Sequence, residues 1–181
     1  VTTYGRDRAA RIAAQPHLRP AIVLESAKLV LPVLVASNSG DLDWRLQEIG
    51  LASPRKVRTL RTPHRGLVTA LSASADGKRL ASADLSGNVY VFDLAAGEQP
   101  VRLTTKLAGR SLALSPDGAK LAIGTVVDGA TQKSQLQVWD LATRRMLVAR
   151  ELVDHVHACA ISPDGNRLAY VGGPRNEVYV E

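Results

Sequence analysis

The chain has 181 residues, 45% of them hydrophobic, which suits one globular domain with a sizeable core. Its formal net charge of +6 lies wholly in residues 1–66, where eleven Lys and Arg face five Asp and Glu, whereas residues 67–181 carry twelve of each sign. The single cysteine, Cys159, excludes an internal disulfide, and the longest apolar run, at 29–36, is far too short to span a bilayer, so we expect a cytoplasmic protein without membrane contact.

Residues 1–20 are predicted to form a separate opening segment. The stretch "GRDRAARIAAQ" at 5–15 sets Arg6, Arg8 and Arg11 beside alanine and isoleucine, a composition that favours a short helix. We interpret this segment as a junction with a preceding domain.

Residues 21–64 are predicted to form a first unit of four strands. An apolar run leads into the turn-rich stretch "VLVASNSGD", and the next strand alternates apolar side chains at Leu42, Trp44 and Leu46. The stretch "KVRTLRT" would close the unit. Its first turn would be "ESAK" in place of the Asp-Gly turn of the later units, so we treat this unit as degenerate.

The stretch "RKVRTLRTPHR" at 55–65 alternates basic and apolar positions. The basic positions are Lys56, Arg58 and His64, set against Val57, Leu60 and Thr62. One interpretation is a site for an anionic partner, either a nucleic acid or an acidic peptide. The other is a solvated outer strand whose cations prevent edge pairing, and the lack of stacking aromatics in this stretch favours it.

Three nearly identical sequence motifs follow along the chain: "SADGKRLASA" at 74–83, "SPDGAKLAIG" at 115–124 and "SPDGNRLAYV" at 162–171. In each, Asp caps its own backbone and Gly supplies the positive φ of a tight hairpin. These turn dipeptides are Asp76-Gly77, Asp117-Gly118 and Asp164-Gly165. They are 41 and 47 residues apart, and a polar hairpin insert at 125–135 accounts for the longer interval.

Each motif lies inside a predicted unit of four antiparallel strands. One apolar strand precedes the turn, a second follows it, and the third strand alternates valine with aromatic residues in "NVYVFDL" (88–94) and "LQVWDL" (136–141). A fourth strand then closes the unit. The units are predicted at 65–107, 108–152 and 153–181, and the last of them is truncated in its third strand.

The dipeptides Phe92-Asp93 and Trp139-Asp140 each follow a Ser-x-Asp-Gly motif, and the stretches that contain them resemble WD40 repeats. The intervals between the motifs fit the period of about 40–45 residues found in such repeats. The resemblance implies an all-β fold built from β-propeller blades of four antiparallel strands. Because three or four blades do not complete a ring of the usual size, we interpret the chain as a fragment of a larger propeller.

In WD40 repeats, a histidine from a Gly-His pair, a strand Ser or Thr, a turn Asp and the Trp form a hydrogen-bonded network inside the blade. Here His64 holds the histidine position and Ser82 is suitably placed, but Ser86 stands where the Asp is expected and Phe92 replaces the Trp. We therefore expect this network to stay open and the blade to depend on packing. In the last unit His155 stands in for the Gly-His histidine.

The resemblance implies a non-catalytic module for protein–protein interaction or sensing, as the regulatory or scaffold part of a larger protein such as a bacterial multidomain effector. Its partners would be other proteins, or the remaining blades and domains of the same protein, and no cofactor is expected. The alternative is an enzyme-associated propeller of the TolB-like, prolyl oligopeptidase or lactonase kind, which lacks the Trp-Asp ending. A weaker alternative is nucleic-acid binding through 55–65.

The sequence contains no phosphate-binding loop, nucleophile elbow or paired-cysteine metal motif. His155, His157 and Cys159 alternate and could hold zinc with a fourth ligand, but we favour a loop histidine, a small buried cysteine and no metal. Partner contacts are expected instead at charged residues in turns between strands. These are Arg65, Asp84, Arg110, Lys133 and Arg175.

Overall fold

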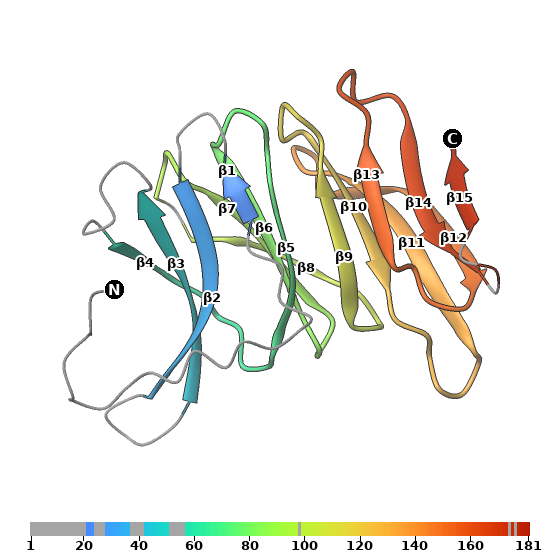
Figure 1. The fold of residues 1–181 in the computed structure, drawn as a ribbon, viewed down its shortest axis with the longest axis horizontal. Coiled ribbons are helices and arrows are strands. Elements are labelled where there is room, and N and C mark those ends of the chain that lie inside the picture. The colour runs from blue at the N-terminus through green and yellow to red at the C-terminus, as the bar shows by residue number, and fades with distance from the viewer. Residues whose placement is uncertain are drawn as a thin grey trace.

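The computed structural model describes residues 21–23, 28–36, 42–50, 57–97, 99–173, 175 and 177–181. This part of the chain contains fifteen β-strands in four antiparallel sheets, which stand side by side without closing into a ring (Figure 1). The expected all-β fold class is therefore confirmed, whereas the helix expected within 1–20 falls outside the described residues. Over the same ranges, no helix has the length and apolar character needed to cross a membrane.

The first sheet is a meander with the order β1-β2-β3-β4. Its strands are β1 (Ala21–Val23), β2 (Lys28–Ala36), β3 (Leu42–Gly50) and β4 (Val57–Arg61). Val30, Leu46 and Leu60 are buried in one apolar cluster with Leu80 and Phe92 of the next sheet. Both turns expected in this sheet fall on residues that are not described, apart from the last residue of "ESAK".

The second and third sheets are complete four-stranded meanders. The second comprises β5 (Val68–Ala73), β6 (Arg79–Asp84), β7 (Asn88–Asp93) and β8 (Val101–Thr104). The third comprises β9 (Gly109–Leu114), β10 (Lys120–Thr125), β11 (Lys133–Asp140) and β12 (Arg145–Val153). Leu80 pairs with Phe92 in one sheet and Leu121 pairs with Trp139 in the other, so the two sheets repeat one register.

The fourth sheet has three strands within the described residues: β13 (Ala158–Ile161), β14 (Leu168–Gly172) and β15 (Glu177–Val180). Tyr170 and Tyr179 are cross-strand partners, and their rings stack with centroids 5.0 Å apart. Tyr170 also packs with Leu136 and Val156 in the apolar cluster between the third and fourth sheets.

The three Asp-Gly motifs each form a hairpin turn of the same type. In the first, the Ser74 hydroxyl donates to Asp76 Oδ1 at 2.6 Å, and the Lys78 N–H donates to the same oxygen at 3.0 Å. These hydrogen bonds lower the pKa of Asp76, so the carboxylate stays ionised. Gly77 completes the turn at φ 68, in the left-handed region that favours glycine. The other two turns use Ser115, Asp117 and Gly118, and then Ser162, Asp164 and Gly165.

The aspartate of each aromatic–Asp dipeptide closes the turn that leads to the fourth strand. Asp93 Oδ1 accepts the N–H groups of Ala95 and Ala96 at 3.0 and 2.8 Å. Asp140 Oδ1 accepts the N–H and the hydroxyl of Thr143 at 2.7 and 2.8 Å. These aspartates therefore act in local turn geometry, as Asx-type turns require.

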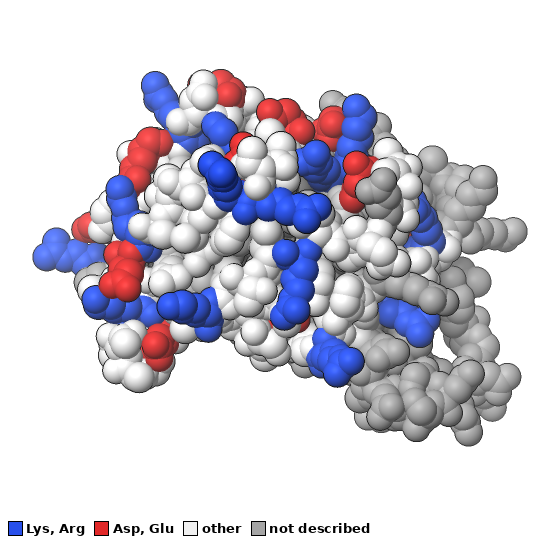
Figure 2. Space-filling model, turned by 180° about the vertical axis from the view of Figure 1, so that it is seen from behind, with Lys and Arg blue, Asp and Glu red and all other residues white. Residues whose placement is uncertain are grey.

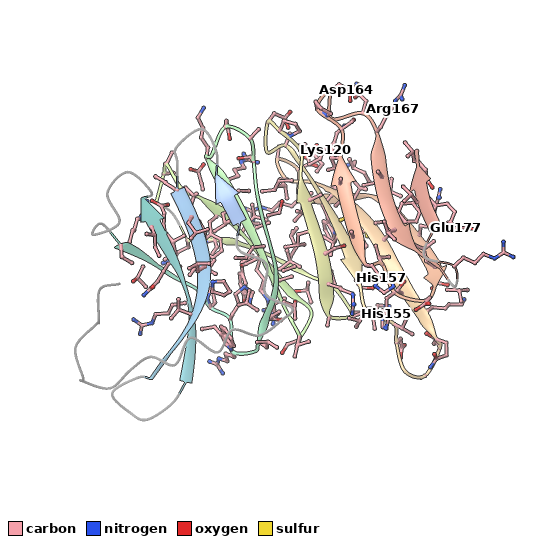
Figure 3. The ribbon with its side chains drawn as sticks, viewed as in Figure 1. Lys120, His155, His157, Asp164, Arg167 and Glu177 are labelled. Carbon is pink, nitrogen blue, oxygen red and sulfur yellow. The ribbon has the colours of Figure 1, made fainter. Side chains whose placement is uncertain are left out.

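The antiparallel order of the strands places the Asp-Gly turns at one end of the sheets and the links between sheets at the other. Figure 3 shows Lys120, Asp164 and Arg167 along the first end and His155 and His157 at the second. We call these the Asp-Gly end (the side of the sheets with the turns 74–79, 115–120 and 162–167) and the linker end (the side with the links 62–67, 105–108 and 154–157 and the turns between the second and third strands).

Candidate functional site at the linker end

A chain of three buried side chains joins the link before β5 to the end of β6. His64 Nδ1 lies 2.7 Å from Asp84 Oδ2, and His64 Nε2 lies 2.7 Å from Ser82 Oγ. The Tyr90 ring packs edge-on against the imidazole, with ring centroids 4.6 Å apart. The expectation that this network would stay open was wrong for the carboxylate, which Asp84 supplies in place of Ser86, whereas Phe92 brings no hydrogen-bond donor to the Trp position.

Asp84 also closes the turn between β6 and β7. Its Oδ1 accepts the N–H groups of Ser86 and Asn88, both at 2.9 Å. The expectation of a surface contact at Asp84 was therefore wrong, because the residue is 0% exposed and its oxygens are engaged inside the sheet. In the third sheet Thr125 takes this place, and its hydroxyl accepts the N–H of Gln135 at 2.8 Å.

Burial sets the protonation of this network. It lowers the pKa of His64, although the hydrogen bond and the charge of Asp84 oppose the shift. Burial would raise the pKa of Asp84, but the hydrogen bonds from His64 and Asn88 outweigh it and lower that pKa overall. A neutral imidazole that donates from Nδ1 to the carboxylate and accepts the Ser82 hydroxyl proton satisfies all three groups.

Acidification is expected to destabilise the fold through His64. Because burial lowers the pKa of this histidine in the folded chain, only the unfolded chain binds its proton as the pH falls below 6.5. The free energy of unfolding should fall by up to about 1.4 kcal/mol per pH unit, until the pH reaches the folded pKa. Urea unfolding between about pH 7.5 and about pH 5.5 measures this slope, and an equal slope in His64→Gln would contradict the assignment.

Ser82, His64 and Asp84 make the same contacts as the nucleophile, base and orienting acid of hydrolytic enzymes. All three side chains are buried, Ser82 and Asp84 in β6 and His64 in the link before β5. A substrate carbonyl therefore has no approach to Ser82 Oγ, and the arrangement holds the sheet together without offering a nucleophile.

The histidines and the cysteine near the start of the fourth sheet do not form a metal site. His155 and His157 lie in the link before β13, and His155 Nδ1 accepts the N–H of Val127 at 2.8 Å. The Cys159 thiol lies 3.3 Å from Ser111 Oγ, and burial raises its pKa to about 11, which makes it a poor nucleophile. In the described ranges, no three His, Cys, Asp or Glu side chains come close enough to hold a metal ion.

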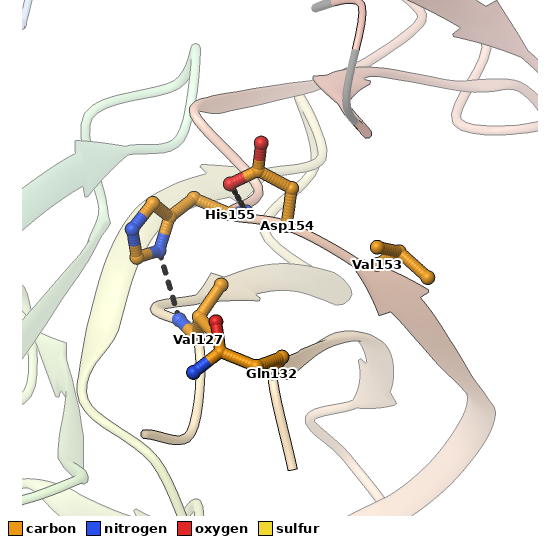
Figure 4. Close-up of a pocket in the computed structure, with 5 residues that line it drawn as sticks. All are labelled: Val127, Gln132, Val153, Asp154 and His155. Carbon is orange, nitrogen blue, oxygen red and sulfur yellow. Dashed lines mark hydrogen bonds between the residues drawn. The ribbon is translucent and has the colours of Figure 1, made fainter. Parts of the chain in front are cut away.

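A hollow of about 340 Å³ opens at the linker end, between the β10–β11 hairpin and the link from β12 to β13 (Figure 4). Its lining residues are Val127, Gln132, Val153, Asp154 and His155. Asp154 Oδ1 accepts the N–H of His155 at 2.7 Å. Gln132 and Asp154 have φ 56 and φ 71, left-handed values that few non-glycine residues adopt and that cluster at binding sites.

Four of the five residues predicted to contact partners are exposed at the linker end. They are Arg65 before β5, Arg110 in β9, Lys133 at the start of β11 and Arg175 between β14 and β15. Lys133 Nζ forms an ion pair with Glu151 at 2.9 Å, and Arg175 lies 3.8 Å from the carboxylate that begins β15. Neither Arg65 nor Arg110 forms an ion pair with any side chain that the structure describes, so both are free to meet a partner.

Residues 57–65 of the basic stretch form the outer strand β4 and the link that follows it, whereas Lys56 lies outside the described residues. Arg58 is exposed and donates to the Leu94 carbonyl at 3.3 Å, whereas Leu60 is buried. The expected alternation fails at Val57, which is 43% exposed, and at His64, which is buried in its network. On the face shown in Figure 2, the Lys and Arg side chains of the described residues are spread among Asp, Glu and uncharged residues.

Residues 54–93 match the family model described as WD domain, G-beta repeat. The match begins before β4 and ends with β7, so the repeat unit of the sequence is offset by one strand from the sheets. One sequence repeat therefore supplies the last strand of the first sheet, β4, and the first three strands of the second sheet, β5 to β7.

The chain is 30% identical over 103 residues to small ribosomal subunit protein RACK1y of Oryza sativa subsp. japonica, in an alignment that covers 57% of this chain and 28% of that protein. It is 38% identical over 78 residues to cilia- and flagella-associated protein 44 of Chlamydomonas reinhardtii, which covers 40% of this chain and 4% of that protein. The chain thus spans only a minor part of either relative. The repeat match at 54–93, the two relatives and the four-stranded meanders together show that this chain contains a WD40 repeat and is similar to proteins built from such repeats.

Proposed function

We propose that the chain is part of a non-catalytic β-propeller module that binds protein partners at its linker end. One observation carries the proposal: exposed cations from the second, third and fourth sheets and a preformed hollow all lie at this end. Loops held by rigid sheets lose little conformational entropy on binding, which suits them to recognition.

The relatives support a scaffold role. One is named for the small ribosomal subunit and the other for cilia and flagella, and both names refer to large assemblies. We propose that the present chain contributes the regulatory or scaffold part of a larger protein in the same way. Its blades would then be the units 21–64, 65–107, 108–152 and 153–181.

The test is a charge reversal at the linker end. Partners captured by the whole chain would be identified by mass spectrometry, and the affinity for each would be measured for the double variant Arg65→Glu, Arg110→Glu. We expect the affinity to fall about tenfold at low salt, because both arginines are exposed and free of ion pairs.

The matched control carries the same charge change at the Asp-Gly end, in Lys78→Glu combined with Arg167→Glu, which are both exposed. Equal losses in the two variants would show a general charge effect and would overturn the linker end as the binding face. Retention of the chain on single-stranded DNA that weakens steeply with salt would instead support a nucleic-acid partner.

A further inference from the structure

We propose that the hollow between the β10–β11 hairpin and the β12–β13 link binds an arginine or lysine side chain of a protein partner. The inference rests on the proposed function, since it names what this pocket at the linker end would take from the partner. Charge, wall chemistry and rigidity each support it.

The charge of the hollow favours a cation. Asp154 uses one carboxylate oxygen for the His155 N–H, and the other oxygen has no hydrogen-bond partner among the described residues. Asp128 of the β10–β11 hairpin is half-buried next to the lining residue Val127, and its Oδ1 accepts the N–H of Ala130 at 2.9 Å. The neighbouring cation Lys133 is already paired with Glu151 at 2.9 Å, so negative charge is left uncompensated here.

The walls of the hollow fit a long side chain with a charged tip. Val127 and Val153 provide apolar surface, and 62% of Val153 is exposed to solvent in the single chain. Lysine and arginine bury their aliphatic stems against such surface while the charged head meets an anion. His155 Nδ1 accepts the Val127 N–H, which fixes the ring, and the imidazole offers a flat face on which a guanidinium stacks.

The hydrogen bonds already present disfavour an anionic ligand. The two backbone donors are engaged, the Val127 N–H by His155 Nδ1 at 2.8 Å and the His155 N–H by Asp154 at 2.7 Å. The donors left in the lining are His155 Nε2–H and one amide hydrogen of Gln132, and the Asp154 carboxylate beside them repels an anion. The carboxylate oxygen of Asp154 is an acceptor only. The free hydrogen-bonding capacity of Asp154 is thus that of a cation-binding group.

The hollow is held in place before any ligand arrives. The Ser134 hydroxyl donates to the Asp154 carbonyl, and Gln132 Nε2 donates to the Gly129 carbonyl at 2.9 Å. The Asp128 N–H and the Lys133 carbonyl close the hairpin at 2.8 Å. A preformed site of this kind spends less of its binding free energy on ordering.

The test uses the blocked tripeptide acetyl-Ala-Arg-Ala-amide, with citrulline in place of arginine as a neutral probe of the same shape. Titration into the ¹⁵N-labelled chain should shift the amide signals of Val127, Gln132 and His155 in a saturable way. We expect the citrulline peptide to bind at least about tenfold more weakly, which corresponds to about 1.4 kcal/mol.

The variant Asp154→Asn should also lower the affinity for the arginine peptide about tenfold, while asparagine tolerates the left-handed backbone. Asp164→Asn, at the Asp-Gly end, is the control that should bind like the original chain. Equal binding of the two peptides, unchanged binding in Asp154→Asn, or no saturable shift would each overturn the proposal. In all three cases a partner that depends on Arg65 and Arg110 would still support the proposed function.

Discussion

Replacing His64 by alanine is expected to lower the free energy of unfolding by about 3 kcal/mol. The change removes both hydrogen bonds of the imidazole and leaves Ser82 and Asp84 buried without this partner. A buried carboxylate that loses a hydrogen-bond donor costs more than the bond itself contributes, because water cannot replace that donor. Urea unfolding followed by circular dichroism would measure the change.

Arg65→Ala is the control for this prediction, since Arg65 is the exposed neighbour and its loss should cost less than about 0.5 kcal/mol. Alanine at position 64 also removes the ring contact with Tyr90, so a double-mutant cycle with Ser82→Ala is needed to isolate the hydrogen bond. We expect a coupling of about 1 kcal/mol in that cycle. Additive effects would mean that the contact between His64 and Ser82 does not stabilise the fold.

The hairpin turns and the strand pattern could be predicted because their signals are local. Asp76 and Gly77 fix their turn through hydrogen bonds that reach no more than five residues along the chain. The strand β7 lies where "NVYVFDL" predicts it, although Val89, Tyr90, Val91 and Phe92 are all buried, so both faces of the strand are covered and the expected half-burial was wrong. Neither feature depends on how the sheets pack against one another.

The buried network and the hollow could not be predicted in the same way, because they join distant residues. Asp84 lies 20 residues from His64, and Val127 lies 28 residues from His155. Family spacing pointed to Ser86, inside the turn, whereas the carboxylate comes from the last residue of β6. One local signal was available: the N–H groups of Ser86 and Asn88 need an acceptor, and the aspartate two residues before this Ser-Gly-Asn turn supplies one.

Replacing Gly124 by alanine is expected to lower the free energy of unfolding by about 2 kcal/mol. A Cβ at this position would lie 2.5 Å from Ser111 Oγ and 2.8 Å from Val156 Cβ, closer than side-chain atoms approach. Val156 is 0% exposed in the apolar cluster between the third and fourth sheets, so it can yield only if the two sheets separate. Urea unfolding of the variant and the original chain would measure the loss.

Gly129→Ala is the matched control, because a Cβ there would meet nothing within 4 Å and the stability should change by less than about 0.5 kcal/mol. Val127 lies shortly after Gly124 in the chain, and His155 directly precedes Val156. Forcing the two sheets apart at Gly124 and Val156 should therefore strain the 2.8 Å hydrogen bond from the Val127 N–H to His155 Nδ1. Hydrogen exchange at that N–H should therefore accelerate in Gly124→Ala and stay slow in Gly129→Ala. Equal stability and equal protection in the two variants would show that the packing of the third sheet on the fourth does not hold the hollow in shape.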